Sequence, residues 1–203
     1  MGRPSLHPAS ALIDAAQGLA AAASTEAVTI AAVARAAGAP VGSIYHRFSS
    51  RDELLAAAWL DAQVAFQAGF VKALRDAGTT PGLAAARQVV EWSRQEPVRA
   101  RLLVLHQARD FRSSAWGEED RERSRALATE LEAALSDFCD RHLGGRGGAH
   151  RRLATFALLD LPYASVRRYL AAGFPPPPEV DGYLEVALAA LLPAGTKLDP
   201  PAF

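Results

Sequence analysis

Residues 29–48 constrain the fold of this chain more than any other segment, because their pattern predicts two short helices bent around a glycine. Thr29 is a favourable N-cap for the first helix. Gly38 can adopt the positive φ that a sharp turn after that helix requires. The second helix is expected over residues 40–48. Two short helices joined in this way form a helix-turn-helix, whose second helix fits the major groove of DNA.

The second helix of this pair has two different faces. At about 3.6 residues per turn, Ile44 and Phe48 share one side, with Val41 near them, and this side is expected to pack on the two preceding helices. Tyr45 and Arg47 lie on the flanks. The opposite side carries small or hydrogen-bonding residues, namely Gly42, Ser43 and His46. This division suits a helix that reads a groove, with phosphate binders at its edges.

Each outward residue can be given a role in DNA binding. Gly42 allows the helix backbone to approach DNA closely, and Ser43 and His46 can bond to base edges. Phosphate contacts are expected from residues at the edges, namely Thr29, Tyr45 and Arg51. Arg3, in the N-terminal arm, is a candidate for the minor groove, and the alternative is a disordered terminus. The alternative for the helix is that these residues form the ordinary surface of a small helical hairpin.

Apolar residues recur at helical spacing along almost the whole chain, which predicts an all-α fold. The capping-box pattern of Ser50 and Glu53, with Glu53 reaching back to the Ser50 amide, starts a long fourth helix. Pro162 is expected to kink the eighth helix, and the prolines of residues 175–178 form a stiff link. About nine helices are expected, over residues 10–23, 29–37, 40–48, 50–78, 81–96, 102–108, 118–143, 149–172 and 179–192. We therefore predict a helix-turn-helix DNA-binding domain over residues 1–49 and a larger helical body for ligand binding and dimerisation over residues 50–203.

The bulk composition limits the class of protein. Half of the 203 residues are hydrophobic and the net charge is zero, so DNA affinity must come from a local patch. Residues 1–51 carry four arginines against one Asp and one Glu, which gives a net charge of +2. A single cysteine, Cys139, excludes a disulfide framework, and five scattered histidines show no spacing for a metal site. No signal peptide or membrane-length apolar run is recognised, so we expect a cytoplasmic protein without a cofactor.

The region of residues 10–59 resembles the TetR family of bacterial transcriptional regulators. The resemblance rests on Thr29, Val33, Ala34, Ala37, Gly38, Gly42, Ile44, Tyr45, Phe48 and the run of residues 52–55. It implies a homodimer that binds a palindromic operator and a ligand cavity in the body that releases DNA when filled. The family's DNA contacts carry over onto Thr29, Val41, Gly42, Ser43, Tyr45, His46 and Arg51. Two departures are Pro40, where many members have a capping Ser or Thr, and residues 24–26, which lack the glycine that often ends the first helix.

Aromatic residues in the body are candidates for a pocket that binds a small, mostly apolar ligand. The candidates are Trp59, Phe66, Phe70, Trp92, Leu103, His106, Phe111, Trp116, Phe138, Phe156, Asp160 and Tyr163. The alternative is that the aromatics are plain core. His106 with Asp110, and Asp160, are polar groups that can orient a ligand or satisfy one another. Cys139 is a candidate oxidant sensor, or inert packing.

The last two predicted helices, residues 149–172 and 179–192, form the dimer surface that the resemblance implies. Their apolar residues exceed what one thin layer must bury, which agrees with that role.

The resulting hypothesis is a ligand-responsive transcriptional repressor. The first alternative is a helical small-molecule carrier or enzyme with a structural head, and the second is a protein-docking module. Against an enzyme, the sequence shows no nucleophile with a partnered base, no phosphate loop and no paired catalytic carboxylates.

Overall fold

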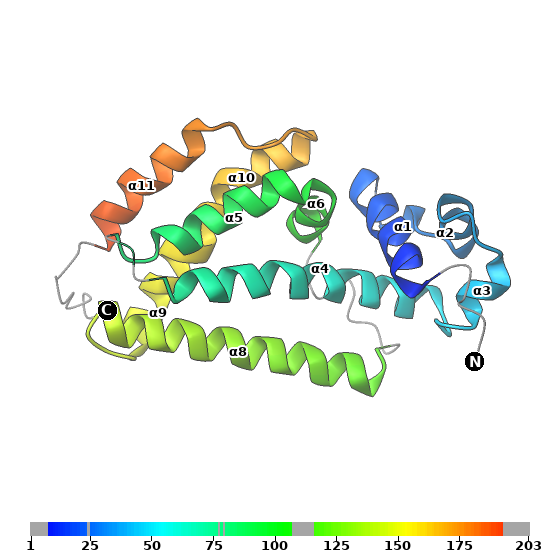
Figure 1. The fold of residues 1–203 in the computed structure, drawn as a ribbon, viewed down its shortest axis with the longest axis horizontal. Helices are drawn as coiled ribbons and strands as arrows, with labels where there is room; N and C mark the ends of the chain where they lie inside the picture. The colour runs from blue at the N-terminus through cyan, green and yellow to red at the C-terminus, as the bar shows by residue number, and fades with distance from the viewer. Residues whose placement is uncertain (1–7, 24, 77, 79, 107–115, 193–203) are drawn as a thin grey trace. The chain divides into compact units, whose positions relative to one another are not determined.

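The computed structural model describes residues 8–23, 25–76, 78, 80–106 and 116–192, and this part of the chain is helical without a strand, as predicted (Figure 1). The described part of the chain has ten α-helices. The π-helical segment η2 joins α9 and α10 into one continuous helix, so the number of continuous helices in this part is nine. The elements in chain order are α1 (Ala9–Ala22), the 3₁₀ turn η1 (Thr25–Ala27), α2 (Ile30–Ala36), α3 (Val41–Tyr45), α4 (Arg51–Leu74), α5 (Leu83–Gln95), α6 (Pro97–Leu105), α8 (Glu118–His142), α9 (Gly148–Thr155), η2 (Phe156–Asp160), α10 (Leu161–Ala172) and α11 (Glu179–Leu191).

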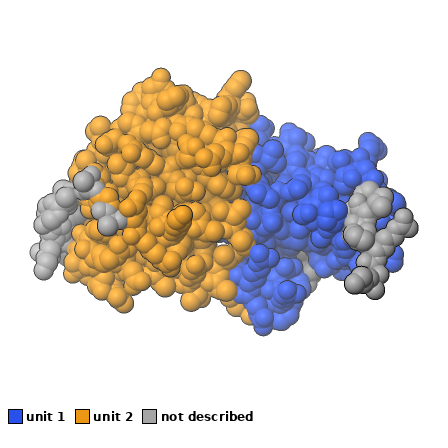
Figure 2. All heavy atoms as spheres, in the orientation of Figure 1, with its two compact units in different colours: residues 1–63, 98–124 blue, residues 64–97, 125–203 orange. Residues whose placement is uncertain are grey.

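The chain forms two compact units (Figure 2). The first unit consists of residues 1–63 and 98–124, and the second unit consists of residues 64–97 and 125–203. Helix α4 contributes to both, because the division falls between its residues 63 and 64. These units are defined by packing, and the functional boundary between residues 49 and 50 stays a prediction.

The core of the first unit joins the helix-turn-helix to the start of α4. Leu12 of α1, Ile44 of α3 and Leu54 of α4 are each fully buried in one hydrophobic cluster. Burial of each such side chain contributes about 1.5–3 kcal/mol relative to exposure. The short helices α2 and α3, which are too short to be stable alone, therefore take their stability from this shared core.

The core of the second unit is centred on α5, which packs against η2, α10 and α11. Phe70, Phe138 and Leu158 are fully buried there. Helix α11 buries Val180, Leu184 and Leu188, which are four residues apart and therefore lie on one face. The long helix α4 is apolar enough by length and composition to span a membrane, but 56% of its most apolar window is buried, as expected for a core helix.

Helix boundaries differ from the prediction where prolines act. Pro97 opens α6 instead of only ending α5, because proline is tolerated in the first turn of a helix. The sixth helix therefore begins at Pro97, five residues before the predicted start. At Pro162, where we expected a kink, the structure has the π-helical segment η2 immediately before the proline-bearing first turn of α10. Proline cannot donate to the carbonyl four residues earlier, which favours a wider turn there.

Candidate nucleic-acid interface

The turn between α2 and α3 is fixed by capping at both ends of α2. Thr29 is the N-cap, and its Oγ1 accepts a hydrogen bond from the Ala32 amide at 3.1 Å. At the other end, Gly38 has a φ of +62°. The Gly38 amide donates to the Arg35 carbonyl and the Ala39 amide donates to the Ala34 carbonyl, which is the pattern of a Schellman motif. The predicted glycine turn is therefore present with its full set of backbone bonds.

Helix α3 and the turn after it present a small, open face to solvent, with the helix ending at Tyr45 and His46 as its C-cap, three residues before the predicted end at residue 48. Gly42 and His46 are exposed, and Tyr45 is 57% exposed. A Cβ built on Gly42 would meet none of the described atoms within 4 Å, so this position is uncrowded. Ile44 and Phe48 are buried, as expected from the helical wheel. The inner and outer faces of this helix thus separate packing from recognition.

Val41 corrects the helical-wheel assignment. We expected it beside Ile44 on the packed side, but it is 45% exposed. The cause is that α3 has only five residues and begins at Val41, directly after Pro40, whose side chain makes no cap hydrogen bond. At the first helical position, the side chain lies at the end of the helix rather than over its packed face. Val41 is therefore exposed, and its role as a DNA contact stays a prediction.

Arg51 has partners that the sequence did not predict. Its Nε donates to the Val28 carbonyl at 2.6 Å, and its Nη2 donates to the Thr25 carbonyl. Its Nη1 pairs with Asp52 at 3.0 Å. Because Arg51 is the first residue of α4, it ties that helix to the connection between α1 and α2. Three of its five N–H groups are used in this way, which leaves two for a phosphate.

The start of α4 also carries the expected capping box, with one difference. Ser50 Oγ accepts from the Glu53 amide at 3.1 Å, as predicted. Glu53 Oε2, however, accepts from the amide and the hydroxyl of Ser49, at 2.6 and 2.5 Å, instead of from the Ser50 amide. The carboxylate reaches one residue further back and satisfies two donors there.

A buried glutamine holds α1 against α4 and α6 within the first unit. Gln17 is 2% exposed, and its Nε2 donates to the Ala58 carbonyl and to Asp61 Oδ2, both at 2.9 Å. Arg99 of α6 pairs with the same Asp61 carboxylate at 3.1 Å. The sequence pattern did not predict this cluster, although a glutamine among the apolar positions of α1 was a possible signal.

The candidate pocket residues fall into separate groups. In the second unit, Phe66 lies 5.7 Å from Phe70 and 5.3 Å from Trp92 between ring centroids, so these three aromatics are brought together. In the first unit, Trp59 and Trp116 lie 6.3 Å apart. The rings of Phe66 and Phe70 are stacked, the ring of Phe66 meets that of Trp92 edge-on, and their role in a ligand pocket stays a prediction.

The remaining candidates are placed individually. His106 Nε2 lies 3.3 Å from the Ala20 carbonyl in the first unit, and Leu103 packs against that unit's core. Phe138 is fully buried in the second unit, whereas Asp160 is exposed. Phe156 and Tyr163 are 49% and 40% exposed. Arg3, Asp110 and Phe111 lie outside the described residues.

A hollow of about 200 Å³ is present in the second unit between the end of α4 and the start of α5. Its lining includes Asp76, Thr80 and Arg87, and none of the candidate pocket residues belongs to it. Cys139 is fully buried, and burial raises the pKa of its thiol. A raised pKa lowers the thiolate fraction at neutral pH, which favours inert packing over oxidant sensing for this residue.

A capped helix-turn-helix whose second helix exposes small and hydrogen-bonding residues, within an all-helical chain, defines a DNA-binding regulator of transcription. Residues 12–58 match the model of the family described as bacterial regulatory proteins, tetR family. This match covers the helix-turn-helix and the start of α4, the same region in which the sequence resembles the TetR family. No curated protein matches the chain in sequence.

Solved structures of similar fold cover nearly the whole chain. A transcriptional regulator from Rhodococcus sp. Rha1 has a TM-score of 0.69 at 20% identity, covering 95% of this chain and 99% of the other. The fatty acid degradation regulator FadR from Bacillus halodurans has a TM-score of 0.67 at 14% identity, covering 95% and 97%. The TetR-family regulator PfmR from Thermus thermophilus has a TM-score of 0.64 at 17% identity, covering 91% and 98%. At these identities the likeness shows a shared fold.

Proposed function

We propose that this chain is a ligand-responsive transcriptional repressor that binds a palindromic operator as a homodimer in the cytoplasm and is released by a small, mostly apolar effector. The observation that carries the proposal is the outer face of α3, where Gly42, Tyr45 and His46 are exposed beside a fully capped turn. A helix with only a structural role has no need of a small residue at the centre of its exposed face. The proposal assigns the chain no catalytic activity.

The DNA contacts divide into two kinds. Ser43 and His46 are proposed to read base edges, and Val41 is proposed to add an apolar contact such as one with a thymine methyl group. The phosphate contacts are proposed for Thr29, Tyr45 and Arg51, and a minor-groove contact for Arg3. Because the N-terminal residues carry a net charge of only +2, one copy is expected to bind weakly, and two copies must act together.

The proposed dimer surface is formed by the continuous helix of α9, η2 and α10, which is the predicted helix of residues 149–172, together with α11. In the second unit, these elements expose large apolar side chains, namely Phe156 at 49%, Tyr163 at 40%, Tyr183 at 67% and Val186 at 73%. Apolar groups exposed at this density on neighbouring helices mark an interaction surface. A twofold axis would place the same patch of two copies face to face.

The effector is proposed to act through the aromatic stack of the second unit. Phe66 and Phe70 belong to α4, and Trp92 belongs to α5. A ligand that inserts between these rings would bind one arrangement of α4 better than another, and would shift the population away from the DNA-binding state by that difference in affinity.

Footprinting tests the DNA-binding proposal. The full chain is incubated with the intergenic DNA beside its own gene, and with a random-sequence library, at several salt concentrations. We expect one protected palindrome, with affinity that falls as salt rises. Tyr45→Ala should weaken binding to all sequences, whereas His46→Ala should change sequence preference. Failure of both DNA sources to yield a specific site would refute the proposal, and equal losses without change in preference would refute the two roles.

A thermal-shift screen of apolar metabolites tests the effector proposal, because a bound ligand raises apparent stability by mass action. Fatty acids are included because a protein of similar fold regulates their degradation. A true effector must also release the protein from the footprinted site, and a ligand that stabilises the chain without releasing DNA would contradict the proposed mechanism.

A further inference from the structure

The link before α11 has an unusual hydrogen-bonding composition. Residues 175–178 are four consecutive prolines, which supply four carbonyl acceptors and no N–H donor. The link makes no hydrogen bond within itself, because none of its four residues has an N–H. Pro176 is buried and Pro177 is half-buried, so the carbonyls of these two residues need donors from outside the link.

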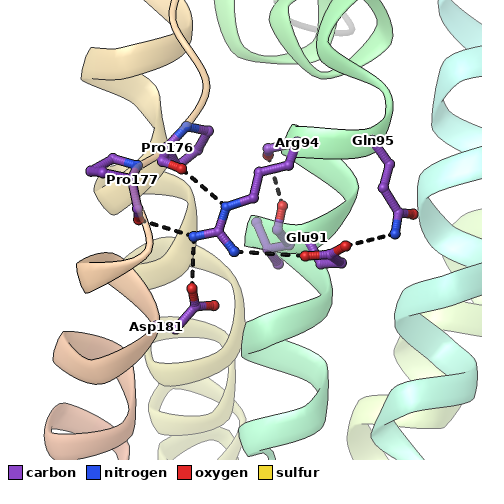
Figure 3. A network of polar contacts seen from close by, with 8 residues as sticks. Glu91, Arg94, Gln95, Pro176, Pro177 and Asp181 are labelled. Carbon is purple, nitrogen blue, oxygen red and sulfur yellow. Dashed lines mark hydrogen bonds and ion pairs between the residues drawn. The ribbon is translucent and has the colours of Figure 1, made fainter.

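Arg94, near the end of α5, supplies those donors (Figure 3). Its Nε donates to the Pro176 carbonyl at 3.0 Å, and its Nη2 donates to the Pro177 carbonyl at 2.9 Å. The same Nη2 lies 2.6 Å from Asp181 Oδ2 in the first turn of α11. Nη1 completes the network with Glu91 at 3.6 Å. One guanidinium thus joins α5 to both the proline link and the start of α11.

These contacts meet where α11 begins. The Pro177 carbonyl, besides its bond from Arg94, accepts a hydrogen bond from the Val180 amide at 3.2 Å. Asp181 stands in the first turn, where a negative charge interacts favourably with the helix dipole. The Arg94 guanidinium therefore holds the carbonyl that precedes the helix and a carboxylate within its first turn.

The rotation of α11 about its own axis decides which side chains it presents outward. Leu184 and Leu188 are buried against the second unit, whereas Tyr183 and Val186 are among its most exposed apolar residues. Adjacent positions on a helix differ by about 100°, so a modest rotation would turn Tyr183 and Val186 away from a partner. Apolar packing is not directional, so the buried side of α11 does little to oppose such a rotation. The hydrogen bonds and ion pair of Arg94 at the start of α11 are directional and do oppose it.

We propose that Arg94 is a positioning residue for dimerisation, which fixes the start of α11 and so orients the face that carries Tyr183 and Val186. This inference rests on the proposed homodimer. It assigns Arg94 no contact with DNA, with an effector or with the second copy. Its effect on assembly passes through the proline link and Asp181.

The chain offers a matched control between the same two helices. Arg87 of α5 pairs with Glu185 of α11 at 2.8 Å, with the two side chains 47% and 52% exposed. An ion pair this exposed contributes little, because water screens it. Arg94 is 24% exposed and bonds to main-chain carbonyls as well as to a carboxylate. Arg87→Met and Arg94→Met each remove one positive charge, but only Arg94→Met also removes the hydrogen bonds to the Pro176 and Pro177 carbonyls.

The test uses the full chain and two measurements. Hydrogen exchange of the amides at residues 180–184 reports the fixation of α11, and sedimentation velocity over a range of concentrations gives the dimer dissociation constant. In Arg94→Met, we expect exchange about ten-fold faster and a dissociation constant about ten-fold higher, as for loss of a charge-assisted bond. In Arg87→Met, we expect changes below about two-fold. Arg94→Lys keeps the charge but cannot reach all acceptors, and should fall between Arg94→Met and the wild type.

The outcomes separate the two proposals. Equal exchange in the wild type and Arg94→Met, or equal effects of the Arg87 and Arg94 variants, would overturn the role of Arg94. A folded wild type that stays monomeric at all concentrations would overturn the proposed homodimer, and with it the effect of Arg94 on assembly. If Arg94→Met fails to fold by circular dichroism, Arg94→Lys and Asp181→Asn carry the same comparison.

Discussion

Replacement of Arg51 by alanine should weaken the helix-turn-helix itself as well as its binding to DNA. The substitution removes the bonds from Arg51 to the carbonyls of Val28 and Thr25, which anchor the connection between α1 and α2 to the start of α4. A role confined to phosphate binding would leave the free protein unchanged. The free energy of local opening is therefore the quantity that distinguishes the two roles.

The magnitude follows from the geometry. A hydrogen bond that involves a charged group contributes about 1.5–3 kcal/mol when it is buried. The Arg51 side chain is 36% exposed, so we reduce this to about 1 kcal/mol for each carbonyl bond. The ion pair with Asp52, whose side chain is 52% exposed, adds less than about 0.5 kcal/mol. The expected loss is about 2 kcal/mol, which is roughly a thirty-fold increase in the opening equilibrium.

Hydrogen exchange of the amides at residues 28–33 measures this loss in the absence of DNA. Arg35→Ala is the matched control, because Arg35 has the same charge and is exposed in α2. DNA affinity is then measured against salt for both variants. If Arg51 only holds the helix-turn-helix in place, the DNA affinity of Arg51→Ala falls, while the slope of log affinity against log salt concentration stays near the wild-type value. Unchanged exchange, together with a slope reduced by about one unit, would refute the positioning role and leave Arg51 as a phosphate ligand.

Three further predictions concern stability and use denaturation of the full chain. Gly82→Ala should destabilise the folded chain by about 2 kcal/mol, since φ at Gly82 is +74° and a Cβ there would come within 2.3 Å of buried Leu158. Gly18→Ala is the control, because a Cβ at Gly18 meets nothing within 4 Å, and it should not destabilise the chain. Burial, and to a lesser degree the charge of Arg141, lowers the pKa of His142 below 6.5 in the folded chain. The unfolded chain therefore protonates the His142 imidazole more readily than the folded chain does. The wild type should therefore lose stability as pH falls below about 6.5, and His142→Gln should lose less; an identical pH dependence would contradict this. Phe70→Ala should cost about 4 kcal/mol, because the ring is fully buried, and a loss below about 1 kcal/mol would show that the aromatic stack is not packed core.

The sequence was sufficient for features that depend on neighbours within one helical turn. The cap at Thr29, the turn at Gly38 and the buried pair Ile44 and Phe48 were all predicted and are present. The cap and the turn rest on hydrogen bonds between residues three to five positions apart, and the shared side of Ile44 and Phe48 follows from their spacing of four, although their burial needs the core formed with α1 and α4. The same locality made the family recognisable from residues 10–59.

The sequence was insufficient where a side chain has a choice of partners. The helical wheel placed Val41 on the packed side, and only the short length and the start of α3 explain its exposure. The aromatic candidates for a pocket have helical spacing in either case, and only packing shows that Phe66, Phe70 and Trp92 form one stack. An apolar pattern reports that a residue is buried, without stating against what.

The sequence by itself therefore determined the all-α fold, the helix-turn-helix and the resemblance of residues 12–58 to the TetR family. The tertiary structure alone decided the partners of the arginines. Arg51 bonds to carbonyls 23 and 26 residues away, and Arg94 pairs with Asp181, 87 residues away. The physical reason is that a guanidinium bonds to any acceptor within reach, and what is within reach at such separations is set by the packing of helices rather than by local propensity.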